Sequence, residues 1–276
     1  MDLTFLIPLK LDSYDRVRNI ITVLIYLLTN YKAKILLKEV DTQQRFDELI
    51  LPQLKKRIKN KHLNRLQYFY EVPQKEYFHK TKILNDLLKI STTTVVCNYD
   101  TDVILPISSV NKSYELIMSG QSDAVYPYGV GVYQKAVSYV EELYFQFLDT
   151  KMGENDIKTL DKYSSPNSST IGWCQFIRRE NYINSFMMNE NFAAWGPEDC
   201  ELFYRLNLLG NKVDRIDDVV YHLEHARTTD SWFSNPHWQE NVKLWEWIRR
   251  QTKENLIQYY HNQEYIKRRQ TNVSVQ

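Results

Sequence analysis

An apolar run leads directly into two aspartates in the stretch Thr94-Val95-Val96-Cys97-Asn98-Tyr99-Asp100-Thr101-Asp102. The run predicts a buried strand over Thr94–Cys97, because short apolar segments bounded by polar residues are typical of sheet cores. Asp100 and Asp102 stand at alternate positions, so an extended chain can aim both carboxylates at one point. Such carboxylates suit Mg²⁺ or Mn²⁺ that carries a diphosphate. The same pattern also occurs in solvated turns, so its meaning depends on where the strand lies in the fold.

Three strand–helix units precede this stretch. In chain order, we predict a strand at Leu3–Ile7, a helix that Asp12 or Ser13 can cap, a strand at Ala33–Val40, a helix at 43–58, a strand at Leu66–Val72 and a helix at Phe78–Ile90. Four alternating units within about the first 100 residues predict an α/β fold with a mixed, mainly parallel sheet flanked by helices. Such sheets bind ligands at the carboxyl ends of their strands. Lys10, Glu39 and the two aspartates fall at such ends.

The second half of the chain predicts shorter elements. The predicted helices are Pro106–Ser119, Ala136–Leu148, Arg179–Phe186 and 237–260, and the predicted strands are Asp123–Tyr128, Cys174–Ile177, Lys212–Ile216 and Val219–Leu223. Residues 150–170 are polar and predict a loop, and loops of this length in compact domains are often functional.

The composition predicts a cytoplasmic protein that does not bind nucleic acid. The 35 basic and 34 acidic residues balance, so no global field draws the chain to nucleic acid. The cysteines Cys97, Cys174 and Cys200 lie far apart in the sequence, which indicates a reducing compartment. No apolar run is long enough to span a bilayer. The aromatic and basic C-terminal helix leaves peripheral contact with a membrane open, although packing against the domain is the simpler interpretation.

An indole and two acids meet at a predicted loop–helix junction within Asn191–Leu206. Pro197 is suited to open a helix, because its missing N–H is not needed there. Glu198 and Asp199 follow in the first turn, where the helix dipole favours carboxylates, and Trp195 lies just ahead. Acids at a helix start are as often caps as functional groups, so this stretch leaves both interpretations open.

His222 and His225 form the second candidate cluster. Imidazoles are common ligands of transition metals. A spacing of three residues places both rings on one side of a helical turn, but on a strand they diverge. The pair ends a predicted strand, so spacing alone favours one core and one surface histidine unless the chain turns after Leu223. Asp102 with His225 would make a mixed oxygen and nitrogen site that suits Mn²⁺ better than Mg²⁺.

The ordered set of motifs resembles the GT-A glycosyltransferases, whose fold is Rossmann-like. It is most similar to the β-1,4-galactosyltransferase family and to bacterial relatives among the inverting family 2 enzymes. The motifs, spread over about residues 3–240, are Ile7-Pro8-Leu9-Lys10, Phe78-His79-Lys80-Thr81-Lys82-Ile83-Leu84-Asn85, Asp100-Thr101-Asp102, Trp195-Gly196-Pro197-Glu198-Asp199-Cys200-Glu201-Leu202-Phe203-Tyr204-Arg205-Leu206, and His225-Ala226-Arg227 followed by Asn235-Pro236. We therefore expect a GT-A domain over 1–236, with a nucleotide-binding half at about 1–103 and an acceptor and catalytic half at about 104–236, and a C-terminal helical extension over 237–276.

The resemblance implies a UDP-sugar donor and a Mn²⁺ or Mg²⁺ cofactor. Asp102 resembles the carboxylate that binds the metal, and His225 resembles a second protein ligand. His222 stands where the animal enzymes carry a methionine ligand, so the resemblance implies a third ligand there. The implied nucleotide-binding residues are Pro8, Leu9, Lys10, Glu39, Phe78, Lys80 and Asp100.

On the acceptor side, Asp199 resembles the general base and Glu198 resembles a residue that binds sugar hydroxyls. Trp195 resembles an aromatic residue at the junction of donor and acceptor. Gly172 falls in the family's Gly-Gly pair ahead of the central strand, with Trp173 after it, and both are expected to contact sugar or acceptor.

The implied reaction is the metal-dependent, inverting transfer of a sugar of the galactose or N-acetylhexosamine class. Its acceptor would be a hydroxyl of a glycan or a lipid-linked saccharide, as in polysaccharide biosynthesis. Two alternatives stay open. A sugar-nucleotidyltransferase uses a similar sheet and metal but usually needs a Gly-rich loop after the first strand, and Leu9–Ser13 has no glycine. A non-catalytic carbohydrate-binding or scaffold protein on the same fold would release no UDP from any sugar donor.

Overall fold

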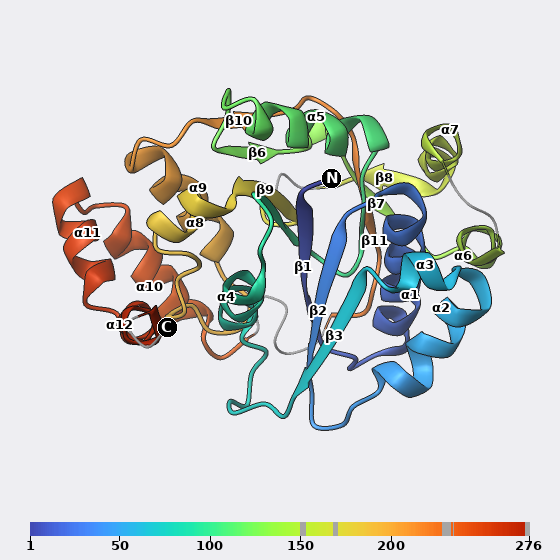
Figure 1. Cartoon of the computed structure of the whole chain (residues 1–276), viewed down its shortest axis with the longest axis horizontal. Coiled ribbons are helices and arrows are strands. Elements are labelled where there is room, and N and C mark those ends of the chain that lie inside the picture. The colour runs from blue at the N-terminus through green and yellow to red at the C-terminus, as the bar shows by residue number, and fades with distance from the viewer. Residues whose placement is uncertain (150–152, 168–170, 228–232, 234, 274–276) are drawn as a thin grey trace.

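The computed structural model describes residues 1–149, 153–167, 171–227, 233 and 235–273 (Figure 1). Within these ranges, seven strands form the central sheet in the order β10-β6-β9-β4-β1-β2-β3. They are β1 Leu3–Leu9, β2 Lys34–Val40, β3 Leu66–Glu71, β4 Val95–Tyr99, β6 Ala124–Tyr126, β9 Cys174–Arg178 and β10 Val213–Arg215. β1 is parallel to β2 and β4, and β2 is parallel to β3, whereas β9 runs antiparallel to β4 and β6. The predicted mixed, mainly parallel sheet flanked by helices is confirmed.

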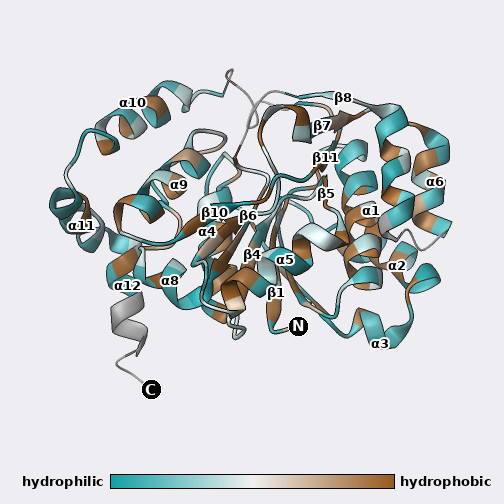
Figure 2. Cartoon of the chain, turned by 90° about the horizontal axis from the view of Figure 1, so that it is seen from above, coloured by the Kyte–Doolittle hydropathy of each residue, from teal (hydrophilic) through white to brown (hydrophobic). Residues whose placement is uncertain are grey.

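Helices cover both faces of this sheet (Figure 1). They include α1 Tyr14–Asn30, α2 Leu51–Arg57, α3 Asn60–Leu63 and α5 Ile107–Met118 on one side, and α4 Lys80–Ile90, α8 Arg179–Asn184 and α9 Glu198–Leu208 on the other. Side chains along β1 alternate between the two layers, because successive residues of a strand point to opposite faces. Phe5 and Ile7 pack with the first set of helices, and Leu6 packs with the second. Figure 2 shows the apolar residues gathered on the central strands, as this layering requires.

The start of α1 confirms the predicted cap. The backbone N–H of Arg16 donates to Ser13 Oγ at 3.3 Å, which satisfies one of the free donors of the first turn. The single helix predicted over 43–58 is wrong in its first part, because a π-helical turn, η1 (Phe46–Ile50), precedes α2. Pro52 lies at the start of α2 and lacks the N–H that a regular helix would need there.

Within the described residues, a second, smaller sheet has the strand order β5-β11-β7-β8. Its strands are β5 Val103–Ile104, β7 Gln134–Val137, β8 Ser164–Pro166 and β11 Val220–Leu223. β11 runs antiparallel to β5, with His222 opposite Val103. This pairing joins segments that are far apart in the sequence, and it brings the end of β11 against the turn that follows β4.

The helix predicted from Ala136 is wrong in its first residues. Gln134–Val137 is the strand β7, and the helix α6 runs over Glu141–Asp149. β7 pairs with β11 on one side and with β8 on the other, and this tertiary pairing outweighs the local helical pattern.

The segment predicted as a loop over 150–170 is more regular than expected. Its described part contains α7 (Glu154–Ile157), the 3-10 turn η3 (Lys158–Tyr163) and β8. Residues 150–152 and 168–170 of this prediction lie outside the described residues.

The C-terminal helices pack against α9. They are α10 Trp238–Ile248, α11 Lys253–His261 and α12 Glu264–Val273, so the helix predicted over 237–260 is interrupted after residue 248. Tyr260 is fully buried and donates from its hydroxyl to Glu201 Oε1 of α9 at 2.5 Å. Glu201 also forms a fully buried ion pair with Arg205, one turn further along α9. The C-terminal segment therefore supports the helix that carries Glu198 and Asp199. In the described part of the chain, every helix is too short or too polar to span a bilayer.

Candidate active site

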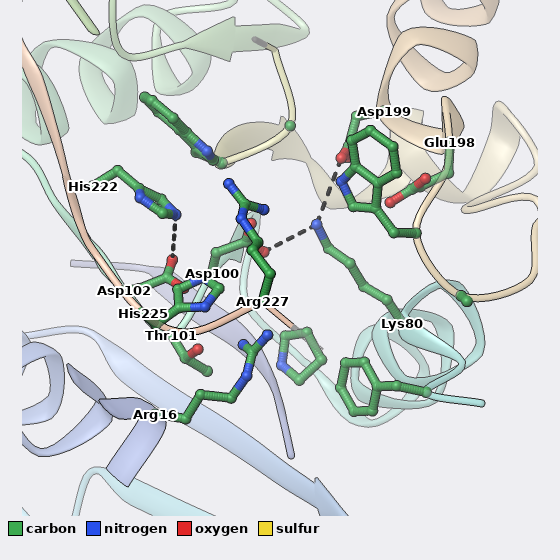
Figure 3. A pocket seen from close by; sticks show the side chains of 16 residues that line it. Arg16, Lys80, Asp100, Thr101, Asp102, Glu198, Asp199, His222, His225 and Arg227 are labelled. Carbon is green, nitrogen blue, oxygen red and sulfur yellow. Dashed lines mark ion pairs between the residues drawn. The ribbon is translucent and has the colours of Figure 1, made fainter. Parts of the chain in front are cut away.

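A polar cavity of about 170 Å³ lies at the carboxyl ends of β1 and β4 (Figure 3). Its lining includes Pro8, Phe78, Lys80, Asp100, Asp102, Gly172, Trp173, Trp195, Glu198, Asp199, His222 and His225. These side chains come from segments spread over most of the chain. The fold therefore brings most of the predicted site residues into one cavity, at the edge of the sheet where parallel α/β sheets bind ligands.

Asp102, His222 and His225, here called the metal triad, meet on one side of the cavity (Figure 3). Nε2 of His222 lies 3.5 Å from Asp102 Oδ1, and Nε2 of His225 lies 3.2 Å from Asp102 Oδ2. One potential ligand atom from each residue falls within 4.8 Å of the others. The β5–β11 pairing produces this geometry, since the backbone N–H of Leu223 donates to the carbonyl of Asp102 at 2.7 Å. His222 lies within β11 and His225 lies beyond the end of this strand. The chain turns between them, so both rings reach the carboxylate of Asp102.

The chemistry of the metal triad fits a divalent cation. Asp102 Oδ1 is buried and has no hydrogen-bond partner among the described residues, so an acceptor is left for a ligand. Burial opposes ionisation of Asp102, but His222 and His225 hold the pKa of this carboxyl well below its usual range. Burial lowers the pKa of His222, against the opposing effect of Asp102, and so favours the neutral imidazole that coordinates a metal. One carboxylate and two imidazoles suit Mn²⁺ and similar transition cations better than Mg²⁺.

Lys80 links the two sides of the cavity. Its ammonium lies 3.0 Å from Asp100 Oδ1 and 3.5 Å from Asp199 Oδ2 (Figure 3). Burial disfavours the charged amine, but Asp100 and Asp199 outweigh it and hold the pKa of Lys80 well above its usual value. Burial raises the pKa of Asp100 to about 7, against the opposing effect of Lys80. Lys80 begins α4, so a rigid helix fixes its position.

Glu198 and Asp199, here called the carboxylate pair, lie on the opposite side from the metal triad, in the first turn of α9. The helix begins at Glu198, one residue after the predicted start, with Pro197 as the cap residue. Gln175 donates from its side-chain amide to Asp199 Oδ1 at 3.2 Å. A Cβ atom on Gly172 would collide with Asp199 Oδ2, so glycine is required for the carboxylate to lie where it does.

Burial opposes ionisation of both carboxyls of the pair, but their neighbours differ. Burial raises the pKa of Asp199, while Lys80 and Gln175 oppose that shift. Burial and the neighbouring Asp199 raise the pKa of Glu198 to about 8. Glu198 Oε2 is buried and has no hydrogen-bond partner within the described ranges. The raised pKa favours the protonated form of Glu198 near pH 7, and this form can donate a hydrogen bond to a ligand.

Three residues predicted to bind nucleotide do not line the cavity. The Leu9 side chain is buried in the apolar core. Lys10 lies 3.8 Å from Asp12, outside the cavity lining. The Glu39 carboxylate accepts hydrogen bonds from the backbone N–H groups of Arg45 and Phe46 at 3.0 and 3.2 Å, so it caps the turn at η1. Pro8 and Phe78, by contrast, do line the cavity.

The sequence prediction missed contributors to the site. Arg227 lines the cavity near the metal triad but was noted only as part of a motif, without a role. Arg16 was not missed, because its position at a helix start already suggested that it could meet a phosphate; it lines the cavity, and its Nε lies 3.0 Å from Asp12 Oδ1. Gln175 gave a usable signal, because a polar residue interrupts an otherwise apolar strand there.

Two tryptophans predicted to meet sugar have different surroundings. Trp195 stacks on Trp238 of α10 with ring centroids 5.1 Å apart, and its carbonyl accepts from the side-chain amide of Asn235 at 2.8 Å. Trp173 instead stacks on His222, with centroids 5.0 Å apart and ring planes 21° apart. One indole therefore packs against α10, and the other contacts a member of the metal triad.

No protein-family model and no curated protein sequence matches this chain. Solved structures do resemble it. A mannosyltransferase from Pyrobaculum calidifontis, in complex with GDP-Man and Mn²⁺, superposes with a TM-score of 0.51 at 11% identity, over 82% of this chain and 57% of that one. Residues 1–349 of S. aureus TarS, in complex with UDP-GlcNAc, give a TM-score of 0.56 at 12% identity, over 92% of this chain and 69% of that one. GalNAc-T7 with UDP, GalNAc and Mn²⁺ gives 0.53 at 13% identity, over 82% and 44%.

These identities are low, so the likeness concerns the fold. The chain spans little more than half of the mannosyltransferase and less than half of GalNAc-T7. The mixed sheet, its flanking helices and the position of the cavity agree with a Rossmann-like architecture. The chain has the GT-A-type fold of these glycosyltransferases.

Proposed function

We propose that the chain is a metal-dependent, inverting glycosyltransferase. It would move a sugar of the galactose or N-acetylhexosamine class from a UDP-sugar to a hydroxyl of a glycan or lipid-linked saccharide. One observation carries the proposal: the metal triad and the carboxylate pair face one cavity from opposite sides, with Lys80 between them. The fold neighbours that were solved with GDP-Man and Mn²⁺, with UDP-GlcNAc, and with UDP, GalNAc and Mn²⁺ support this assignment.

The donor would lie across the carboxyl ends of β1 and β4. Asp102, His222 and His225 would hold Mn²⁺, which when bound neutralises charge on the diphosphate of the leaving group. Lys80 lines the same cavity, and its ammonium would contact a phosphate oxygen of the donor. Phe78 and Pro8 offer apolar surface for the nucleotide.

Asp199 would act as the general base. The acceptor hydroxyl gives its proton to the Asp199 carboxylate while its oxygen attacks the anomeric carbon from the face opposite the diphosphate. The new carbon–oxygen bond forms as the bond to the phosphate oxygen breaks, so UDP leaves and the anomeric configuration inverts. Base assistance of this kind contributes about 10²–10⁴-fold to the rate.

The remaining groups would prepare this step. Lys80 and the amide of Gln175 favour the ionised form of Asp199 and fix its orientation. Glu198, which holds its proton, can donate a hydrogen bond to a sugar hydroxyl. Two neighbouring carboxyls then have two roles that their environments set.

A panel of UDP-sugars and GDP-mannose, incubated with the protein and Mn²⁺, tests the proposal without knowledge of the acceptor. We expect slow release of UDP from at least one UDP-sugar, because water can replace the acceptor, and we expect chelation of Mn²⁺ to stop it. No release from any donor, with or without glycan acceptors, would favour a non-catalytic protein on the same fold. Release only from GDP-mannose would keep the reaction type but overturn the choice of nucleotide.

A further inference from the structure

An indole lies against one member of the metal triad. Trp173 precedes β9 and stacks on the imidazole of His222, with ring centroids 5.0 Å apart and planes 21° apart. This near-parallel geometry is the offset arrangement that aromatic pairs favour. The resemblance to known families assigned Trp173 to sugar, but here the ring contacts a potential metal ligand.

The two histidines of the metal triad are oriented in different ways. His225 donates from Nδ1 to the carbonyl of Ala226 at 2.8 Å, which leaves Nε2 with its lone pair for coordination. Such a hydrogen bond on the second ring nitrogen is the usual device that fixes a metal-binding histidine. Within the described residues, no hydrogen bond is present on Nδ1 of His222, and the indole of Trp173 stacks on this ring.

The stacking restricts the χ2 torsion of His222. The χ2 torsion of histidine is broad, so an imidazole without a partner on Nδ1 can rotate its ring away from a ligand position. An indole face held parallel to the ring penalises that rotation. The remaining choice between the two flipped ring positions is made by Asp102, whose Oδ1 faces Nε2 of His222 at 3.5 Å.

Trp173 is itself held firmly. Its backbone N–H donates to the hydroxyl of Tyr128 at 3.2 Å, and its carbonyl accepts from the N–H of Asp100 at 3.1 Å. The ring of Tyr128 also lies against the indole, with centroids 5.9 Å apart. Because Asp100 begins the turn that carries Asp102, one residue ties both the carboxylate and an imidazole of the metal triad to β9.

We propose that Trp173 is a positioning residue for the metal site: it holds the His222 ring in the plane that directs Nε2 at the cation. The inference rests on the proposed function, since it needs the metal triad to bind a metal. The indole of Trp173 would orient His222 in the way that a hydrogen bond on the second ring nitrogen usually orients a metal-binding histidine.

The test is the affinity for Mn²⁺ alone, measured by electron paramagnetic resonance of the free ion. Trp173→Phe keeps an aromatic face, and we expect its affinity to stay within about threefold of wild type. Trp173→Leu keeps apolar bulk without that face, and we expect binding to weaken about tenfold, at the lower end of losses for outer-shell partners. Trp247→Phe, at an exposed position on α10, serves as the matched control and should bind as wild type does. Near-ultraviolet circular dichroism and the metal-free melting temperature check the fold, and Trp173→Met replaces the leucine variant if that one does not fold.

A double-mutant cycle separates positioning from a general structural role. In a His222→Ala background, Trp173→Leu should have no further effect on Mn²⁺ affinity, because the ligand it positions is gone. In a His225→Ala background it should still weaken binding about tenfold. Equal losses in both backgrounds would overturn the inference, as would wild-type affinity in Trp173→Leu. Either result leaves the metal site intact, whereas a wild-type protein that binds no Mn²⁺ overturns the metal site and the inference together.

Discussion

The two sides of the cavity shift the pKa of their carboxyl groups in opposite directions. On the metal side, Asp102 faces two imidazoles, and its pKa lies well below the usual range. On the proposed base side, Glu198 and Asp199 are adjacent in the first turn of α9, and burial raises the pKa of both. We propose that these opposite shifts reflect a division of labour between cation binding and proton transfer.

The supporting structures differ as well. The metal triad is assembled where strands from the two sheets end, and it depends on the pairing of β5 with β11. The carboxylate pair stands on a single helix start, and the buried ion pair of Glu201 with Arg205 anchors that helix further along. The comparison teaches that the proposed cation site depends on tertiary pairing, whereas the proposed base stands at the start of a single helix.

Removal of the proposed base should have the largest effect. Asp199→Asn keeps the shape of the side chain but cannot accept the proton, so kcat for transfer should fall about 10³-fold. Transfer is measured as UDP release in the presence of the acceptor. Glu180→Gln, at an exposed acid in the first turn of α8, is the matched control and should leave kcat unchanged. Near-normal transfer by Asp199→Asn would remove the base side from the mechanism.

Removal of the carboxylate from the metal triad should act on cation binding. Asp102→Asn leaves two imidazoles and no anionic ligand, so Mn²⁺ affinity should fall by more than about 100-fold, since loss of an outer-shell partner already costs about 10–100-fold. Free Mn²⁺ is counted by electron paramagnetic resonance. Asp214→Asn on β10, away from the cavity lining, should bind Mn²⁺ as wild type does. Unchanged affinity in Asp102→Asn would place the cation elsewhere.

The lysine between the two sides should affect both. Lys80→Met removes the ammonium that lies near Asp100 and Asp199, so UDP affinity should weaken by about tenfold or more. It also removes the cation that lowers the pKa of Asp199, so the acidic limb of the pH–rate profile should move to higher pH. Lys82→Met, on the same helix but paired with Glu71 and Asp86, should leave the profile in place. An unmoved acidic limb in Lys80→Met contradicts the proposed link.

The smallest expected effect is on the pH dependence of stability. It tests whether Glu198 is protonated in the folded protein. The pKa of Glu198 is raised from 4.5 to about 8. Between these two pH values the folded protein keeps a proton on Glu198 that the unfolded chain releases. The associated stability is complete below pH 4.5 and is lost as the pH rises through 8. Asp100, with a pKa raised to about 7, and Asp199 act in the same direction.

Glu198→Gln should therefore flatten this dependence without abolishing it. Metal-free protein is melted at pH 5 and at pH 8, and the decrease in melting temperature should be smaller in the variant by about 2–4 °C for each kcal/mol of lost linkage. Glu180→Gln again serves as the control and should follow wild type. An identical pH dependence in Glu198→Gln and wild type would mean that Glu198 is ionised in the folded state.

Much of the fold follows from local patterns. The alternation of apolar strands with amphipathic helices over the first 100 residues or so, and the cap at Ser13, depend on near neighbours in the chain, and the structure confirms them. The strand β7 was missed because its pairing with β8 and β11 overrides the helical pattern that begins at Ala136. Strand propensity depends on such cross-strand context, which a single segment does not reveal.

The candidate site likewise has a part that local sequence patterns predict and a part that depends on long-range pairing. Glu198 and Asp199 could be assigned to a helix start from the sequence alone, because the signal is local. His222 and His225 could not be joined to Asp102 by spacing, since the distance of each from the carboxylate depends on β11 pairing with β5. Glu39 lies at a predicted strand end, but its carboxylate caps η1 through a turn of the chain between residues 39 and 46 that the predicted helix over 43–58 did not include.

Calorimetric titration of UDP in the presence of Mn²⁺ tests the division between the two sides most directly, when wild type, Asp102→Asn and Asp199→Asn are compared. We predict that Asp199→Asn binds UDP with wild-type affinity, whereas Asp102→Asn loses the part of the affinity that depends on Mn²⁺. Equal UDP affinity in all three proteins, or a loss confined to Asp199→Asn, would contradict the account.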